Sequence, residues 1–194
     1  MIDFGAAVGY NGQTLIIVFG GANMARRSVV VPYDEQWKKD FEEIKQYILA
    51  AASEYVLAVE HVGSTAVEGL SAKPIIDIDV VISDYSVFSA ITESLAKIGY
   101  YHEGDLGIKD REAFDYQGER PLPKHHMYVC PSFSEELRRH ISFRDHLRKN
   151  REDMLAYSRV KEEGARRYPE NIDGYIAFKT PCIEKIYEKC IDKI

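Results

Sequence analysis

The chain has 194 residues, of which 45% are hydrophobic, so it can fold as one domain or as a core with a small helical subdomain. Its formal net charge of −6 argues against nonspecific nucleic-acid binding driven by overall charge. The longest early apolar run, residues 15–19, is far too short to span a membrane, and residues 1–4 lack the cationic start of a signal peptide. With three cysteines and no CxxC motif, we expect free thiols in a cytoplasmic protein.

The first 23 residues differ from the rest, because they are rich in glycine and carry only one charged residue, Asp3. The sequence that begins at Met24 then reads like a fresh start. Either residues 14–19 add a strand, or Met24 is the true initiator and the preceding segment is loosely attached and dispensable; we favour the second. The expected division is an N-terminal extension at 1–27, an α/β core at 28–131 and a helical C-terminal part at 132–194 packed on the core.

Hydrophobic periodicity and turn residues predict an α/β region followed by an all-helical region. Asp34 is the expected cap of the first long helix, Ser132 to Glu135 resembles a capping box, and Pro181 should kink or restart the last helix. The expected elements, in chain order, are a short strand at 28–31, a helix at 34–52, a strand at 56–62, a helical turn at 63–69, a strand at 75–82, a helix at 85–98, strands at 100–104, 113–117 and 126–129, and helices at 134–150, 152–167 and 173–192.

The predicted strand at 75–82 carries the strongest functional signal. Asp77 and Asp79 point to the same face of the strand, because side chains alternate along it, and both faces are otherwise apolar. Buried acids rarely lack a partner, and two carboxylates on one face can converge on divalent cations. The alternative is a surface Asp pair on an amphipathic strand, but the strand holds no other polar residue.

A Gly-Ser turn precedes this strand. The backbone N–H groups of Gly63 and Ser64, together with the Ser64 hydroxyl, can bind a phosphate. Lys73, just before the rigid residue Pro74, could reach phosphate across the site, although a solvated loop lysine explains its position equally well.

Two arginines extend an apolar stripe on the predicted helix at 134–150. Arg144 and Arg148 continue the line of Leu137 and Ile141 at helical spacing, so they should meet anions. The phosphates of a nucleotide and a structural ion pair are equally good explanations. Two lysines, Lys161 and Lys179, are weaker phosphate candidates, because lone lysines are usually solvated.

Of the histidines, His126 is the best catalytic candidate. His125 and His126 are adjacent on a predicted strand, so they face opposite sides. If this strand neighbours the Asp strand, His126 could act as a third metal ligand or as a general base. His61, at the end of the strand before Gly63, is at least as well explained as a hydrogen-bonded structural histidine.

Gly63-Ser64, twelve residues and then Asp77-Ile78-Asp79 resembles the signature of the nucleotidyltransferase superfamily, which has the DNA polymerase beta-like fold. More closely, the chain is similar to the GrpB-like family over about residues 28–190. The segments that carry this resemblance are 31–34, 61–67, 69–79, 125–129 and 143–148.

The resemblance implies a nucleotidyltransferase-like mixed sheet with flanking helices and a helical C-terminal part. In active members of the superfamily, the DxD pair and a third acid on a later strand bind two Mg²⁺ ions. Asp77 and Asp79 match the pair, whereas His126 and Tyr128 stand where the third acid is expected, and Tyr128 departs from the family's usual second histidine. Asp115 is the nearest acid flanked by apolar residues. Some relatives are fused to dephospho-CoA kinase, which hints at coenzyme A or adenine nucleotides.

Two functional hypotheses follow. The first is an enzyme that uses Mg²⁺ or Mn²⁺, held by Asp77 and Asp79, to move a nucleoside monophosphate from a nucleoside triphosphate to an unknown small-molecule or macromolecular acceptor. The second is a catalytically degenerate module that binds a nucleotide or a coenzyme A-like ligand. Pyrophosphate release that depends on Mg²⁺ would distinguish the first from the second.

Overall fold

The computed structural model describes residues 29–191. The expectations for residues 1–27, including the strand at 14–19 and a start at Met24, therefore lie outside the described residues. In the part that is described, no helix is long and apolar enough to cross a membrane.

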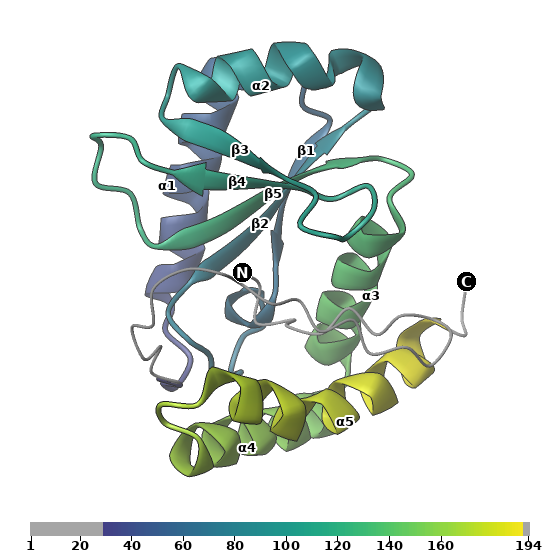
Figure 1. Cartoon of the computed structure of the whole chain (residues 1–194). Coiled ribbons are helices and arrows are strands. Elements are labelled where there is room, and N and C mark those ends of the chain that lie inside the picture. Colours follow the sequence, from purple (N-terminus) through teal and green to yellow (C-terminus); the bar gives the residue numbers. More distant parts are fainter. Residues whose placement is uncertain (1–28, 192–194) are drawn as a thin grey trace.

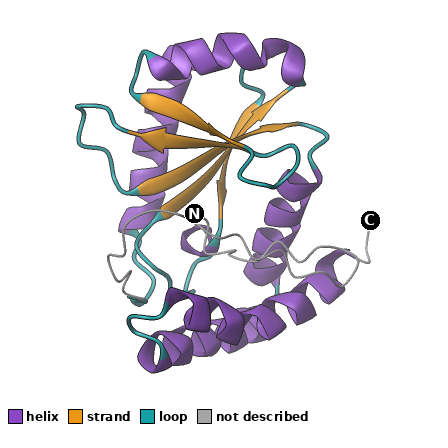
Figure 2. Ribbon diagram, in the orientation of Figure 1, coloured by secondary structure: helices purple, strands orange, loops and turns teal. Residues whose placement is uncertain are grey.

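A five-stranded mixed sheet forms the centre of the molecule (Figures 1 and 2), in the order β1-β2-β5-β4-β3. Only the β2–β5 pair is parallel; the other neighbours are antiparallel. The strands are β1 Ala58–Val62, β2 Ile76–Ile82, β3 Tyr100–Gly104, β4 Glu112–Tyr116 and β5 His125–Pro131. This α/β architecture confirms the predicted fold class.

One face of the sheet carries the larger hydrophobic core. Helices α1 (Gln36–Ala52) and α2 (Phe88–Ala96) cover this face. Helix α1 supplies Trp37, Ile44 and Ile48, which recur at helical spacing and are buried against β2. The residues of β2 that point to this core are Ile76, Ile78, Val80 and Ile82.

The opposite face of the sheet carries a smaller apolar cluster and more polar side chains. Helix α3 (Glu135–Lys149) packs there, and Leu137 shares a small apolar cluster with Val81, Tyr128 and Cys130. Asp77 and Asp79 point to this face, because they alternate with the apolar residues of β2.

Helices α4 (Arg151–Arg167) and α5 (Ile172–Ile191) lie together below the sheet in Figure 1, at the end where β2 begins. They pack with α3 on the connection between β1 and β2, so the helical part reaches the neighbourhood of the Asp pair. The buried residues of this second core are Val67, Leu70, Phe143, Leu147, Met154, Tyr157 and Ile186.

Several local expectations need refinement. The predicted first strand is reduced to an isolated bridge between Val31 and Ala72. Ser134, rather than Ser132, caps α3 by accepting a hydrogen bond from the Leu137 N–H at 3.2 Å. Helix α5 continues through Pro181 instead of restarting there. The turn after β1 contains a short 3₁₀ helix, η1 (Ser64–Ala66).

Candidate functional site

The Asp pair occupies the middle of the sheet and is buried. Asp77 is 4% exposed and Asp79 is fully buried. Across the β2–β5 pair, Asp77 faces His126 and Asp79 faces Tyr128. On the other side, Glu60 of β1 faces Asp79. The structure therefore brings His126 beside the Asp strand, as the sequence argument required.

Each carboxylate of the pair contacts one histidine. His126 Nδ1 lies 3.0 Å from Asp77 Oδ1, and His140 Nδ1 lies 2.7 Å from Asp79 Oδ2. His140 was not among the residues predicted for the site. It lies on α3 three residues after Leu137 and four before Arg144, so the same helical stripe places it against the sheet. A search of that stripe for polar residues other than arginine would have found it.

The environment of His140 favours its charged form. Burial opposes the charge, but the carboxylates of Asp79 and Glu136 outweigh burial and raise the pKa of His140 to about 9. Glu136 Oε1 lies 3.2 Å from Nε2 of this imidazole. Burial would raise the pKa of Glu136, yet its close contact with His140 brings that pKa below the ordinary value. The three groups form a buried ion network on the Asp face.

The Gly-Ser turn lies directly against Asp77. Gly63 has a φ of +70°, and a β-carbon at this position would overlap the Asp77 carboxylate, so only glycine fits without strain. Ser64 begins η1 and is buried. The predicted phosphate-binding turn and the predicted metal-binding carboxylate are therefore in contact.

His61 supports this turn from the opposite side. Its ring stacks on Phe41 of α1, with centroids 4.6 Å apart, and its Nε2 lies 3.0 Å from Thr65 Oγ1. Burial, reinforced by the charges of Arg148 and Arg144, lowers the pKa of His61 to about 4. This neutral, hydrogen-bonded histidine fits the structural explanation given for it.

The two arginines of α3 approach the same turn in different ways. Arg144 is buried, and its Nη1 donates to Glu60 Oε2 at 2.6 Å, while its Nε donates to Asp145 Oδ1 at 2.8 Å. Arg148 is exposed at the helix end, and Nε and Nη2 donate to the Ala66 carbonyl at 3.0 and 2.8 Å. The geometry of Arg144 is that of a structural ion pair. Arg148 is exposed, and its hydrogen bonds to Ala66 hold its guanidinium beside η1.

The lysines do not share one environment. Lys73 is partly exposed, and its Nζ lies 4.8 Å from the centre of the Tyr175 ring. Lys161 and Lys179 are fully buried, which corrects the expectation of solvated side chains. The ammonium groups of these two residues lie 5.4 Å from the Tyr157 ring and 5.1 Å from the Tyr175 ring. The cation–π contacts of all three anchor the helical part.

A third carboxylate does not join the Asp pair. Tyr128 fills the position opposite Asp79, with the buried Arg111 guanidinium 4.3 Å from its ring centre. Asp115 lies on β4, on the same face as Ala113, but it is exposed and accepts a hydrogen bond from Gln117. Within residues 29–191, no three His, Cys, Asp or Glu side chains are grouped so that they could hold a metal ion.

The pair itself is compatible with a Mg²⁺ ion. Among the described residues, no hydrogen-bond donor reaches the buried Oδ1 of Asp79. A buried anionic oxygen of this kind is costly unless a cation or donor satisfies it. Mg²⁺ is commonly held by one or two carboxylates, with waters and substrate phosphates as the other ligands.

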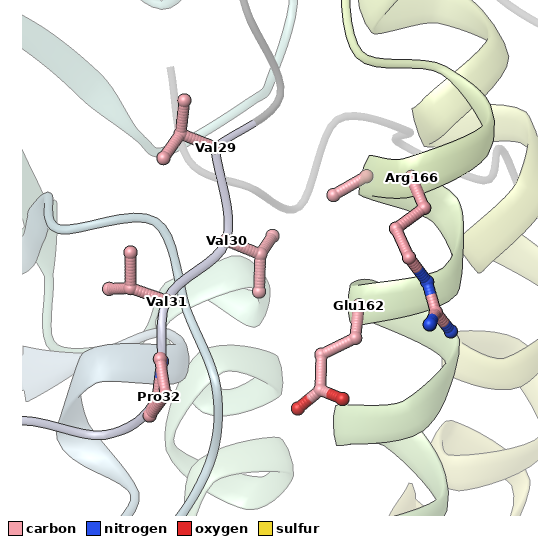
Figure 3. A pocket seen from close by; sticks show the side chains of 7 residues that line it. Val29, Val30, Val31, Pro32, Glu162 and Arg166 are labelled. Atoms are coloured by element: carbon pink, nitrogen blue, oxygen red, sulfur yellow. The ribbon is translucent and has the colours of Figure 1, made fainter.

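A separate pocket of about 460 Å³ lies away from this site, between residues 29–32 and α4 (Figure 3). Three valines form one wall, and Glu162 and Arg166 project from α4 on the other. Glu162 accepts a hydrogen bond from Ser71 Oγ at 2.6 Å, so it ties α4 to the β1–β2 connection. The lining includes none of the residues predicted for the site.

The GrpB protein family matches residues 27–189 of this chain. The chain is 29% identical over 163 residues to UPF0157 protein YqkA of Bacillus subtilis, covering 84% of this chain but only 47% of that protein. It is 32% identical over 163 residues to the glutamate-rich protein GrpB of Alkalihalophilus pseudofirmus, covering 81% of this chain and 92% of that protein.

A solved structure of the conserved protein GrpB from Enterococcus faecalis aligns with a TM-score of 0.71 and 31% identity, over 83% of this chain and 98% of that one. A more distant match is the dephospho-CoA kinase of Mycolicibacterium paratuberculosis, with 25% identity over 186 residues, 84% of this chain and 46% of that protein.

Proposed function

The chain belongs to the GrpB family, and from the geometry of its site we propose that it is a Mg²⁺-dependent nucleotidyltransferase. It moves a nucleoside monophosphate from a nucleoside triphosphate to a hydroxyl-bearing acceptor. One observation carries the proposal: the buried Asp77–Asp79 pair lies against a Gly-Ser turn in which only glycine leaves room for the Asp77 carboxylate.

The residues of the turn and of α3 bind the phosphates. The backbone N–H groups at Gly63 and Ser64 and the Ser64 hydroxyl bind the transferred phosphate. Arg148, exposed and fixed beside η1, and Lys73 neutralise the pyrophosphate that leaves. Arg144 holds Glu60 on β1 and keeps α3 in place.

His126 is the general base of the proposed reaction. Its Nδ1 donates to the Asp77 carboxylate, which leaves Nε2 as the nitrogen that takes the proton of the acceptor. The acceptor oxygen attacks the α-phosphorus, the bond from that phosphorus to the bridging oxygen of the β-phosphate breaks, pyrophosphate leaves, and the acceptor proton passes to Nε2. The chemistry that Mg²⁺ supplies when bound by Asp77 and Asp79 is neutralisation of the charge on the reacting phosphate.

A second candidate function is ligand binding without transfer. It is favoured by His140, which already balances the charge of the fully buried Asp79, and by Tyr128 at the position opposite that acid. The ligand would be a nucleotide or a coenzyme A-like molecule, since a similar protein is a dephospho-CoA kinase.

Incubation of the protein with each α-labelled nucleoside triphosphate, Mg²⁺ and a cell extract tests the first function. We expect pyrophosphate release and a labelled acceptor with the natural chain, and neither with Asp77→Asn. Asp40→Asn is the matched control, because Asp40 lies on α1, far along the chain from the Asp pair, and within residues 29–191 its side chain accepts a hydrogen bond from Gln36. Nucleotide or coenzyme A binding that is independent of Mg²⁺, with no transfer to any acceptor, would favour the second function instead.

A further inference from the structure

Two histidines each occupy one oxygen of the Asp pair. His126 Nδ1 lies 3.0 Å from Asp77 Oδ1, and His140 Nδ1 lies 2.7 Å from Asp79 Oδ2. An ionised carboxylate only accepts hydrogen bonds, so both Nδ1 atoms are donors. The histidines thereby fix the rotation of the two carboxylates and leave one oxygen of each for another partner.

The two remaining oxygens differ in their surroundings. Asp77 Oδ2 lies at the Gly63 turn, in the space that a β-carbon would fill at position 63. Asp79 Oδ1 is buried, and no donor from residues 29–191 reaches it. Two anionic oxygens on neighbouring same-face positions of one strand can share a single cation.

The other acids of this face are already engaged or distant. Glu60, opposite Asp79, is held by Arg144 at 2.6 Å. Glu136 pairs with His140 at 3.2 Å, and Asp115 is exposed on β4. Two further cations on this side of the sheet, Arg111 and Arg144, are also buried. The carboxylate oxygens that remain can therefore serve as ligands for one divalent ion. A second ion would be repelled by the positive charges of these side chains.

We propose that the Asp pair holds one divalent cation, through Asp77 Oδ2 and Asp79 Oδ1, and that His126 and His140 are the positioning residues that limit the site to one ion. The inference rests on the proposed function, because it sets the number of metal ions that the transfer site holds. Replacing His126 by an acid would release Asp77 Oδ1 and add a carboxylate at the neighbouring strand position, which creates room for a second ion.

Electron paramagnetic resonance of Mn²⁺ titrated into the full chain without nucleotide counts the bound ions. We expect one ion per chain for the natural protein, none for Asp79→Asn and two for His126→Asp. Ser89→Asp is the matched control, because Ser89 is exposed on α2, the helix that covers the other face, and it should leave the count at one. Circular dichroism of each variant verifies that it is folded.

The outcomes separate the inference from the proposed function. Two ions on the natural chain would overturn the inference and leave metal-dependent transfer standing. A single ion on a folded His126→Asp variant would overturn the limiting role given to that histidine. If no Mn²⁺ binds to the natural chain, the metal requirement of the proposed function fails together with the inference. If His126→Asp does not fold, the count on the natural chain still decides whether the Asp pair holds one ion.

Discussion

The two faces of strand β2 are stabilised by different interactions, although they belong to the same seven residues. On the α1–α2 side, Ile76, Ile78, Val80 and Ile82 fill a core by shape, and the free energy comes from removing apolar surface from water. On the α3 side, Asp77 and Asp79 are held by paired charges and hydrogen bonds. The stabilisation of the first face depends on the hydrophobic effect alone. The stabilisation of the second depends on the protonation of its side chains and on the presence of every partner.

Removing one partner from the charged face should have the largest effect. His140→Leu leaves the carboxylate of Asp79 buried without its partner, and we expect the free energy of unfolding to fall by about 3–5 kcal/mol. Urea denaturation measures the loss, and adding Asp79→Leu should recover part of it. His102→Leu is the control, since its pair with Glu112 is partly exposed and should be worth about 1 kcal/mol or less. Equal losses in both histidine variants would contradict the contrast between faces.

Truncating the apolar face should cost nearly as much but leave the site unchanged. Ile78 is fully buried, and Ile78→Ala should lower the free energy of unfolding by about 2–5 kcal/mol through lost burial and the cavity that remains. Mn²⁺ affinity of the folded variant should equal that of the natural chain, as measured by calorimetry. A large drop in affinity would show that the two faces are not independent.

The faces should also respond differently to pH. The pKa of His140 is raised to about 9 in the folded chain, above its ordinary value near 6.5. Its contribution to stability is therefore fully present below about pH 6.5 and is lost as the pH rises toward 9, by an amount on the order of 3 kcal/mol. Urea denaturation of the metal-free protein between pH 6 and 10 measures this loss. His140→Gln should flatten that part of the curve, and Ile78→Ala should lower the curve without changing its slope.

The smallest effects separate the two arginines at the edge of the charged face. Arg144→Lys removes the fork that joins Glu60 and Asp145, so stability should fall by about 1.5 kcal/mol while nucleotide affinity of the folded protein is unchanged. Arg148→Lys should leave stability nearly unchanged and weaken triphosphate binding about tenfold, or roughly 1.4 kcal/mol. Arg159→Lys, on the exposed side of α4, should change neither quantity. A loss of affinity in the Arg144 variant would instead favour the phosphate-binding role predicted for Arg144.

Much of the fold could be predicted because the spacing of the apolar residues and the positions of the turn residues indicate the same elements along the chain. The alternation of β2 and the helical stripe of α1 identified the elements and the side that each buries. The predicted strand at 28–31 was wrong, and Val31 forms only an isolated bridge. β-branched residues indicate an extended conformation, but they do not show whether the segment pairs with another strand. The continuation of α5 through Pro181 could not be read either, because tertiary packing overrides the local penalty of proline.

The site was most predictable where its residues are local in sequence. Gly63, Ser64, Asp77 and Asp79 lie on one turn and the strand after it, so spacing alone placed them together. The contact of His126 with Asp77 required the order of strands, and His140 reaches Asp79 from a helix 61 residues later. The burial of Lys161 and Lys179 depends on how α4 and α5 pack, which charge and hydropathy do not encode.

The parallel pairing of β2 with β5 has a consequence for how the molecule assembles. His126 is 49 residues beyond Asp77, and the α2 helix and the β3–β4 hairpin must be traversed before the two meet. Closing such long loops is slow, because their entropy is lost before distant contacts form. During synthesis, Asp79 leaves the ribosome well ahead of His140, so β2 spends that interval with unpaired acids on one side. Those charges keep the nascent strand hydrated and oppose its pairing with other chains until α3 arrives.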